Sequence, residues 1–172
     1  QEAQAKEIAS ALEHPIVASI DSKTHVLGKK SARYTLLEYT DFQCLFCGRA
    51  FLTVEELRKK YGDNLRFVVK DNPLPMHPEA MPAAKWFEAV ALQSPEKGWL
   101  FYDKMFENQG KLGDEFFKQT TKELGLDVAK TQQDAKSKAV ADKIAGDIAE
   151  AAKFGFTGTP GVLLNGVPIR GA

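Results

Sequence analysis

The spacing of apolar residues changes near residue 77. Strand-like runs occur before it, and helical spacing dominates after it. Residues 33–39 and 65–70 are short runs of β-forming residues, typical of central strands that are covered on both faces. Between them, apolar positions three and four residues apart predict a helix over 44–61, closed by Gly62. A strand, a helix and a strand in this order predict a right-handed βαβ unit with parallel strands.

The segments outside this unit are helical or short. Residues 1–13 predict either a short amphipathic helix or a frayed terminus. Residues 16–20 fit an edge strand or an extended lead, and residues 24–27 fit a short strand. Residues 77–154 carry helical patterns throughout, which predicts a mostly helical block of several helices. One of these helices is expected to be capped by Asp127.

The last segment predicts a hairpin. Two short apolar runs, 162–164 and 167–169, flank the dipeptide Asn165-Gly166. Asn-Gly between two apolar runs is typical of a type I′ turn, because both central residues of that turn need a positive φ.

Length and charge exclude several functions. The 172 residues suffice for one domain with a substantial core, and Lys plus Arg equal Asp plus Glu at 23 each. This balance argues against a broad nucleic-acid-binding surface. No apolar run is long enough to span a membrane, and the polar start is unlike a signal peptide. The first residue is Gln1 and not Met, which suggests a processed chain and is compatible with export.

Both cysteines of the chain lie in one motif, Cys44-Leu45-Phe46-Cys47, where the first strand turns into the helix. The first N–H groups of a helix have no intrahelical partner and the helix dipole is positive there, so a thiolate at Cys44 is favoured. Cys47 lies one turn further inside and suits a resolving thiol, which attacks a mixed disulfide on Cys44. The pattern predicts a dithiol–disulfide exchange site.

Two other interpretations of the cysteine pair exist. The first is half of a zinc site, but structural zinc needs four ligands, and His14, His25 and His77 are scattered. We therefore expect no metal. The second is a pair of unreactive buried thiols, which the spacing after a strand disfavours.

The βαβ unit with C-x-x-C, the helical block and the Gly158-Thr159-Pro160 segment before a hairpin resemble the DsbA-like thiol–disulfide oxidoreductases. The resemblance implies an α/β thioredoxin fold, in which helices flank a central mixed β-sheet, with an inserted helical subdomain. The expected parts are an N-terminal arm (1–25), a first thioredoxin part (26–76), the helical insertion (77–154) and a second thioredoxin part (155–172).

Four further site residues follow from the resemblance. It implies that Pro160 is cis and that its loop faces the cysteines, so that the backbone of Thr159 meets an extended substrate; the alternative is an ordinary trans turn. It implies that Glu38 is a buried acid beneath Cys47, with a raised pKa that suits proton transfer; the alternative is a solvated strand end. Lys70 is expected either to pair with Glu38 or to be exposed.

The sequence also departs from the family pattern. Leu45 and Phe46 replace the Pro-His of the strongest oxidants, so we expect a less oxidising couple. Both side chains are expected either to give the site an apolar rim that binds unfolded chains or to pack against the helical block. The family usually continues after the hairpin into a helix that covers the sheet. Either that segment was removed or the N-terminal arm covers the same face.

The implied activity is a protein disulfide oxidoreductase, most simply a DsbA-like oxidase of exported proteins. The alternatives are a disulfide isomerase or reductase of the same compartment, a glutathione-S-transferase-like enzyme, or a non-enzymatic thioredoxin-fold binding module. The implied partners are unfolded or reduced proteins and a membrane redox partner, DsbB-like or DsbD-like, that resets the couple. No cofactor, metal or nucleic acid is expected. The implied location is periplasmic or otherwise exported, with the signal peptide removed.

Overall fold

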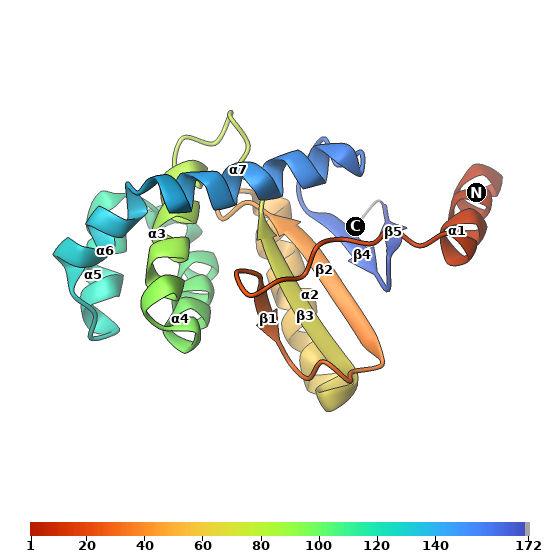
Figure 1. Ribbon diagram of the computed structural model, residues 1–172, viewed down its shortest axis with the longest axis horizontal. Coiled ribbons are helices and arrows are strands. Elements are labelled where there is room, and N and C mark those ends of the chain that lie inside the picture. Colours follow the sequence, from red (N-terminus) through yellow and green to blue (C-terminus); the bar gives the residue numbers. More distant parts are fainter. Residues whose placement is uncertain (171–172) are drawn as a thin grey trace.

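A five-stranded mixed sheet forms the centre of the molecule, with strand order β1-β3-β2-β4-β5 (Figure 1). The structure is a computed structural model and describes residues 1–170. The strands are β1 (His25–Leu27), β2 (Tyr34–Thr40), β3 (Leu65–Asp71), β4 (Gly161–Leu164) and β5 (Val167–Ile169). The helices are α1 (Glu2–Glu13), α2 (Leu45–Tyr61), α3 (Ala80–Gln93), α4 (Pro95–Glu107), α5 (Asp114–Glu123), α6 (Val128–Ala135) and α7 (Lys138–Lys153).

The predicted βαβ unit is confirmed. Strands β2 and β3 are parallel and α2 connects them, while β1 pairs antiparallel with β3 and β4 pairs antiparallel with β2. Residues 16–20 form no strand; they run as an extended segment over one face of the sheet. In the sequence, helices α3 to α7 all fall between strands β3 and β4. The molecule therefore has the thioredoxin fold with a helical insertion.

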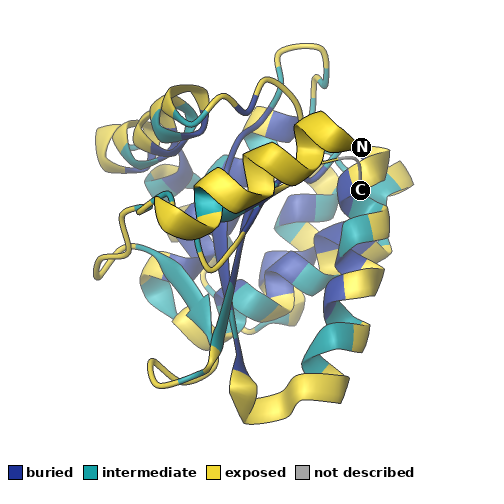
Figure 2. Ribbon diagram, turned by 90° about the vertical axis from the view of Figure 1, so that its right-hand side faces the viewer, coloured by how far each residue is buried: buried dark blue, intermediate teal, exposed yellow. Residues whose placement is uncertain are grey.

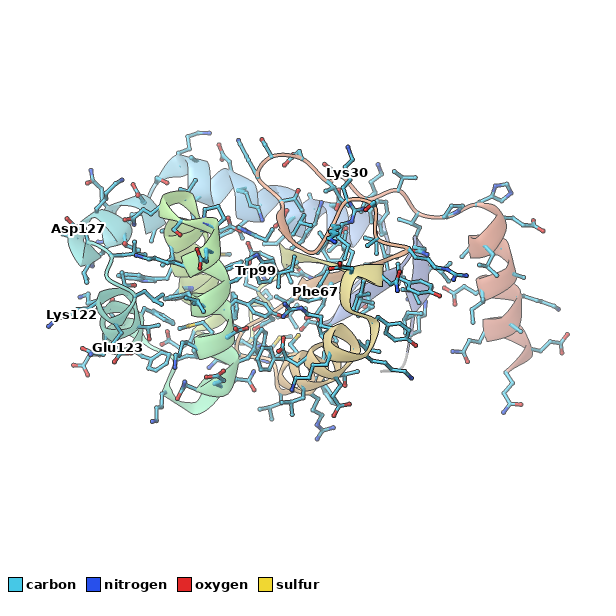
Figure 3. All side chains as sticks on the ribbon, turned by 90° about the horizontal axis from the view of Figure 1, so that it is seen from below. Lys30, Phe67, Trp99, Lys122, Glu123 and Asp127 are labelled. Carbon is cyan, nitrogen blue, oxygen red and sulfur yellow. The ribbon has the colours of Figure 1, made fainter. Side chains whose placement is uncertain are left out.

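The larger hydrophobic core lies between the sheet and the helices α2, α3 and α4. It is rich in aromatic rings: Phe42 lies 5.1 Å from Phe106, and Phe51 lies 5.3 Å from Phe106, measured between ring centroids. Figure 3 shows Phe67 of β3 facing Trp99 of α4, with 6.0 Å between ring centroids. These rings join α2 and the loop before it to the helical block, so the block and the sheet share one core.

A second, smaller core lies on the other face of the sheet. Here Leu37 and Val68 point away from α2, and Ile16 of the N-terminal segment packs against their cluster. The carboxylate of Glu150 in α7 accepts a hydrogen bond from the amide of Ser19 and so links the N-terminal segment to α7. Ile16 and Ala18 of the N-terminal segment therefore cover part of this face.

Helix α1 lies apart from both cores. It has no buried residue and projects from the body of the molecule beyond β5 (Figures 1 and 2). An ion pair of 2.7 Å joins Glu7 to Arg170 and ties the helix to the chain after β5. Of the two possibilities for residues 1–13, the helix is the one observed.

Local signals in the sequence account for several boundaries. Asn165 has φ 48° and Gly166 has φ 81°, as the predicted type I′ turn requires. The side chain of Asp127 accepts a hydrogen bond from the amide of Lys130, which confirms the predicted cap. The first helix of the block starts at Ala80, after tight turns over residues 74–80.

Candidate functional site

The two cysteines lie at the start of α2, directly beyond the carboxyl end of the central strand β2. Cys44 is the N-cap residue and Cys47 lies in the first helical turn. Both are free thiols; Cys44 is 5% exposed and Cys47 is fully buried. The strand ends at Thr40, and the amide of Cys44 then donates a hydrogen bond to the carbonyl of Asp41, which closes the turn into the helix.

The loop before β4 meets this thiol. The Thr159–Pro160 bond is cis. The thiol of Cys44 donates to the carbonyl oxygen of Thr159 across 3.6 Å, although the two residues lie far apart in the sequence. The structure thus brings Pro160 and Cys44 together, as the resemblance implies, and places a main-chain acceptor next to the more accessible sulfur.

A hollow of about 300 Å³ lies beside this contact, lined by Phe46, residues 155–160, Ile169 and Arg170. Leu45 is 72% and Phe46 57% exposed. Phe46 lines the hollow, and both side chains are too exposed to be packed in the helical block. An exposed apolar rim next to a hollow suits an extended chain with apolar side chains.

Glu38 lies beneath the buried thiol, inside the core. It is 1% exposed, and its Oε2 has no hydrogen-bond partner among the described residues. Burial raises the pKa of Glu38 to about 7, although the hydroxyl of Thr40 opposes the shift. Burial also raises the pKa of Cys47, and the negative charge of Glu38 raises it further. The solvated alternative for Glu38 is therefore wrong.

The predicted pairing of Lys70 with Glu38 is wrong. Lys70 aligns with Tyr39 across the parallel strands, whereas Glu38 aligns with Val69. Neighbouring residues of a strand point to opposite faces, so Lys70 and Glu38 lie on opposite faces of the sheet. The exposed alternative is also wrong, because Lys70 is buried and its ammonium donates to Glu150 across 2.6 Å.

Asp41, which sequence reasoning missed, is a central support of the motif. Its Oδ1 accepts from the amides of Gln43 (2.8 Å) and Cys44 (3.2 Å). Its Oδ2 accepts from the amide of Leu74 at 2.9 Å and contacts Nδ1 of His77 at 2.7 Å. An aspartate three residues before a helical cysteine was a usable signal, since Asp often binds backbone amides two residues on.

Gln109, in the short turn after α4, is a second missed support. Its Nε2 donates to the carbonyl oxygens of both Phe42 and Cys44, each at 2.9 Å. The side chain reaches them over Gly48, where an added Cβ would clash with the Gln109 Oε1. No sequence signal links Gln109 to the motif, because the contact depends on how the helical block folds back.

A separate group of acids lies away from the cysteines. Oxygen atoms of Asp71, Glu88 and Asp147 come within 4.8 Å of one another in the buried region between β3, α3 and α7. The ammonium of Lys143 lies 2.7 Å from Glu88 and 2.7 Å from Asp147. The lysine occupies the position that a cation would take, so the group forms a buried ion-pair cluster.

The comparisons with known proteins agree with this geometry. A thioredoxin family model matches residues 21–172. A thioredoxin-like oxidoreductase from Silicibacter pomeroyi DSS-3 has a TM-score of 0.78 and 28% identity, covering 88% of this chain and 85% of its own. DsbA2 of Pseudomonas aeruginosa has a TM-score of 0.70 and 25% identity, covering 88% and 87%. Oxidised BdbD of Bacillus subtilis shares the fold, with a TM-score of 0.79, 19% identity and coverage of 91% and 90%.

Curated relatives match over only part of their length. The Na(+)/H(+) antiporter NhaA of Herminiimonas arsenicoxydans is 37% identical over 166 residues, which is 96% of this chain and 26% of that protein. The chain spans about a quarter of the length of such relatives, so their transport activity is not assigned to it. Among residues 1–170, no helix has the length and apolar character needed to cross a membrane.

The family match covers most of the chain, and the structure shows the C-x-x-C helix and the cis-proline loop that faces it. The chain belongs to the thioredoxin family and has the fold of the DsbA-like proteins.

Proposed function

We propose that the protein exchanges disulfides with protein substrates through the Cys44–Cys47 pair, as an oxidase of exported proteins. The observation that carries the proposal is the 3.6 Å contact between the Cys44 thiol and the carbonyl of Thr159, above the buried pair Cys47 and Glu38. The contact places a nucleophilic sulfur next to backbone groups that can align an extended peptide.

Oxidation of a substrate begins with the disulfide form of the enzyme. A substrate thiolate attacks the Cys44 sulfur, which forms a mixed disulfide and breaks the Cys44–Cys47 bond. Cys47 leaves as a thiolate in a buried site that disfavours charge. Glu38 has a pKa of about 7, so near neutral pH a large fraction carries the proton that the leaving Cys47 needs.

A second substrate thiolate completes the reaction. It attacks the substrate sulfur of the mixed disulfide and expels Cys44 as a thiolate. The substrate gains a disulfide and loses two electrons, and the enzyme gains both as a dithiol. The start of α2 stabilises the expelled thiolate through its free amides. A membrane redox partner, DsbB-like or DsbD-like, would then reset the couple.

The proposal also assigns substrate binding to the cis-proline loop and to the exposed apolar residues of the C-x-x-C motif. Thr159 and Pro160 would align the substrate backbone, while Leu45 and Phe46 would bind apolar side chains of an unfolded chain. The high exposure of both residues and the place of Phe46 in the wall of the hollow support this role. Export to the periplasm or beyond belongs to the same proposal, since stable disulfide formation needs an oxidising compartment.

The test is oxidation of a reduced dithiol peptide by the purified, oxidised protein, with the reduction potential measured against glutathione. Stoichiometric peptide oxidation is expected for the native protein and none for Cys44→Ser. A potential above that of the glutathione pool supports an oxidase, whereas a potential below it favours the reductase alternative. Peptide oxidation by Cys44→Ser at the native rate would refute the assignment.

A further inference from the structure

The Asp41 carboxylate connects the redox motif to the helical block. Its side chain is completely buried, whereas that of His77 is 27% exposed. Oδ1 binds the amides on the motif side, and Oδ2 binds Leu74 and His77 of the loop that leads into α3. A buried carboxylate needs such donors because an unpaired charge in the interior is costly.

The hydrogen bonds fix the orientation of this carboxylate. Three donors are backbone amides, whose positions follow from the fold. The fourth, at 2.7 Å, is the imidazole Nδ1 of His77, which donates to the carboxylate in the tautomer or charge state that carries the Nδ1 proton. Because Oδ1 of the same carboxylate holds the amide of Cys44, the donor on Oδ2 also affects where Cys44 sits.

The position of Cys44 matters for its chemistry. Its sulfur must lie near the Thr159 carbonyl and near the free amides at the start of α2. The side chains between the two cysteines, Leu45 and Phe46, have no polar group that could hold it there. Polar support for the motif therefore comes from other elements.

We propose that His77 is a positioning residue for Cys44, acting through the hydrogen bond from its Nδ1 to Asp41. The inference rests on the proposed exchange activity, since it names a residue that prepares the attacking and leaving sulfur. His77 does not touch the substrate or either sulfur; it acts by holding the Asp41 carboxylate against the Cys44 amide.

The test compares His77→Leu, His77→Asn and the control His14→Leu, an exposed histidine at the end of α1. The reduced proteins are alkylated with iodoacetamide at pH 7, and labelling of Cys44 is followed by mass spectrometry. His77→Leu should slow labelling roughly threefold to tenfold, the effect of one hydrogen bond. In His77→Asn the amide nitrogen replaces Nδ1 as donor, so the rate should return to within about twofold of native. His14→Leu should leave it unchanged.

A second readout separates positioning from folding and from the proposed function. The melting temperature is measured for each variant, together with single-turnover oxidation of a reduced peptide at saturating concentration. A lower melting temperature with native labelling rates would overturn the proposal, as would equally slow labelling in the Leu and Asn variants. If labelling follows the expected pattern but the native protein oxidises no peptide, the exchange function fails and the His77 assignment stands.

Discussion

The carboxyl group of Glu38 lies under the thiol of Cys47, and its negative charge adds to burial in raising the pKa of that thiol. Neither group can hold a charge there at low cost, because Glu38 and Cys47 both lie in the dry core beside β2. Both groups are neutral only when each holds a proton, so loss of a proton from either one leaves a negative charge in the core, which links the redox state of Cys47 to the protonation of Glu38.

Removing the acid should slow the exchange reaction. In Glu38→Gln the Cys47 thiolate that leaves during mixed-disulfide formation has no acid beside it. Single-turnover reduction of the oxidised protein by a dithiol peptide at pH 7 should fall by on the order of a hundredfold, the low end for general acid–base catalysis. Stopped-flow fluorescence measures the rate. Glu56→Gln, which changes an exposed acid of helix α2, is the control, and an equal loss there would contradict the assignment.

The same variant should change how stability depends on pH. The pKa of Glu38 rises from 4.5 to about 7 on folding, so between these values the folded state binds more protons than the unfolded state. Stability therefore falls as pH rises through this window, by about 3 kcal/mol in total. Glu38→Gln should lack this loss and gain relative stability at pH 8 but not at pH 4.5. Urea unfolding at both pH values measures it, and parallel curves would refute the buried-acid role.

The cysteines should differ in reactivity. Burial raises the pKa of Cys47, whereas Cys44 is the more exposed of the two. In the reduced protein at pH 7, alkylation should favour Cys44 by at least on the order of a hundredfold, since the thiolate is the reactive form. Peptide mapping after brief labelling measures the ratio, and similar rates would argue against the arrangement.

A mixed disulfide should accumulate when the buried thiol is removed. In Cys47→Ser, a substrate disulfide attacked by Cys44 stays attached, because no second thiol can resolve it. Non-reducing electrophoresis with a disulfide-containing peptide should show the adduct, which a reductant releases. Cys44→Ser is the matched variant and should form no adduct.

The buried ion-pair cluster should depend on Lys143. In Lys143→Met, Glu88 and Asp147 lose a cation at 2.7 Å, and burial already raises the pKa of Asp71 well above its usual range. The free energy of unfolding at pH 8 should drop by roughly 3–5 kcal/mol, the usual cost of an uncompensated buried charge. A smaller loss is expected at pH 5, where the acids can bind protons.

Lys138→Met is the control for that cluster. Lys138 lies on the same helix α7, but its ion pair with Asp142 is largely exposed, and such pairs contribute little. Equal destabilisation of the two variants would show that the cluster contributes no more than a surface pair.

Local patterns made most of the fold predictable. Strand periods, the Asn165-Gly166 turn and the Asp127 cap depend on nearby residues, and all appear in the structure. The Lys70 pairing failed because a strand register decides which face a side chain occupies, and the alternation places Lys70 and Glu38 on opposite faces.

The site residues that belong to the family motif were predictable from the sequence, and those outside the motif were not. Cys44 and Pro160 come together as expected, but Asp41, His77 and Gln109 were missed. Asp41 binds the amides of Gln43 and Cys44 nearby in the sequence, whereas the contacts of His77 and Gln109 join distant parts of the chain, and no periodicity reports those. Such supports become visible only when the helical block is placed against the sheet.

The hydrogen bonds from Gln109 and His77 have a consequence for protein engineering. A trimmed version that replaced residues 77–154 by a tight linker would keep both sulfurs, the strand–helix–strand unit and the proline loop. It would lose His77 and Gln109, whose hydrogen bonds hold the turn before α2. It would also lose the ring of Phe106, which packs against Phe42. A minimal redox module cannot be cut from this chain at the edges of its thioredoxin segments, because part of the scaffold of its reactive turn is encoded in the insertion.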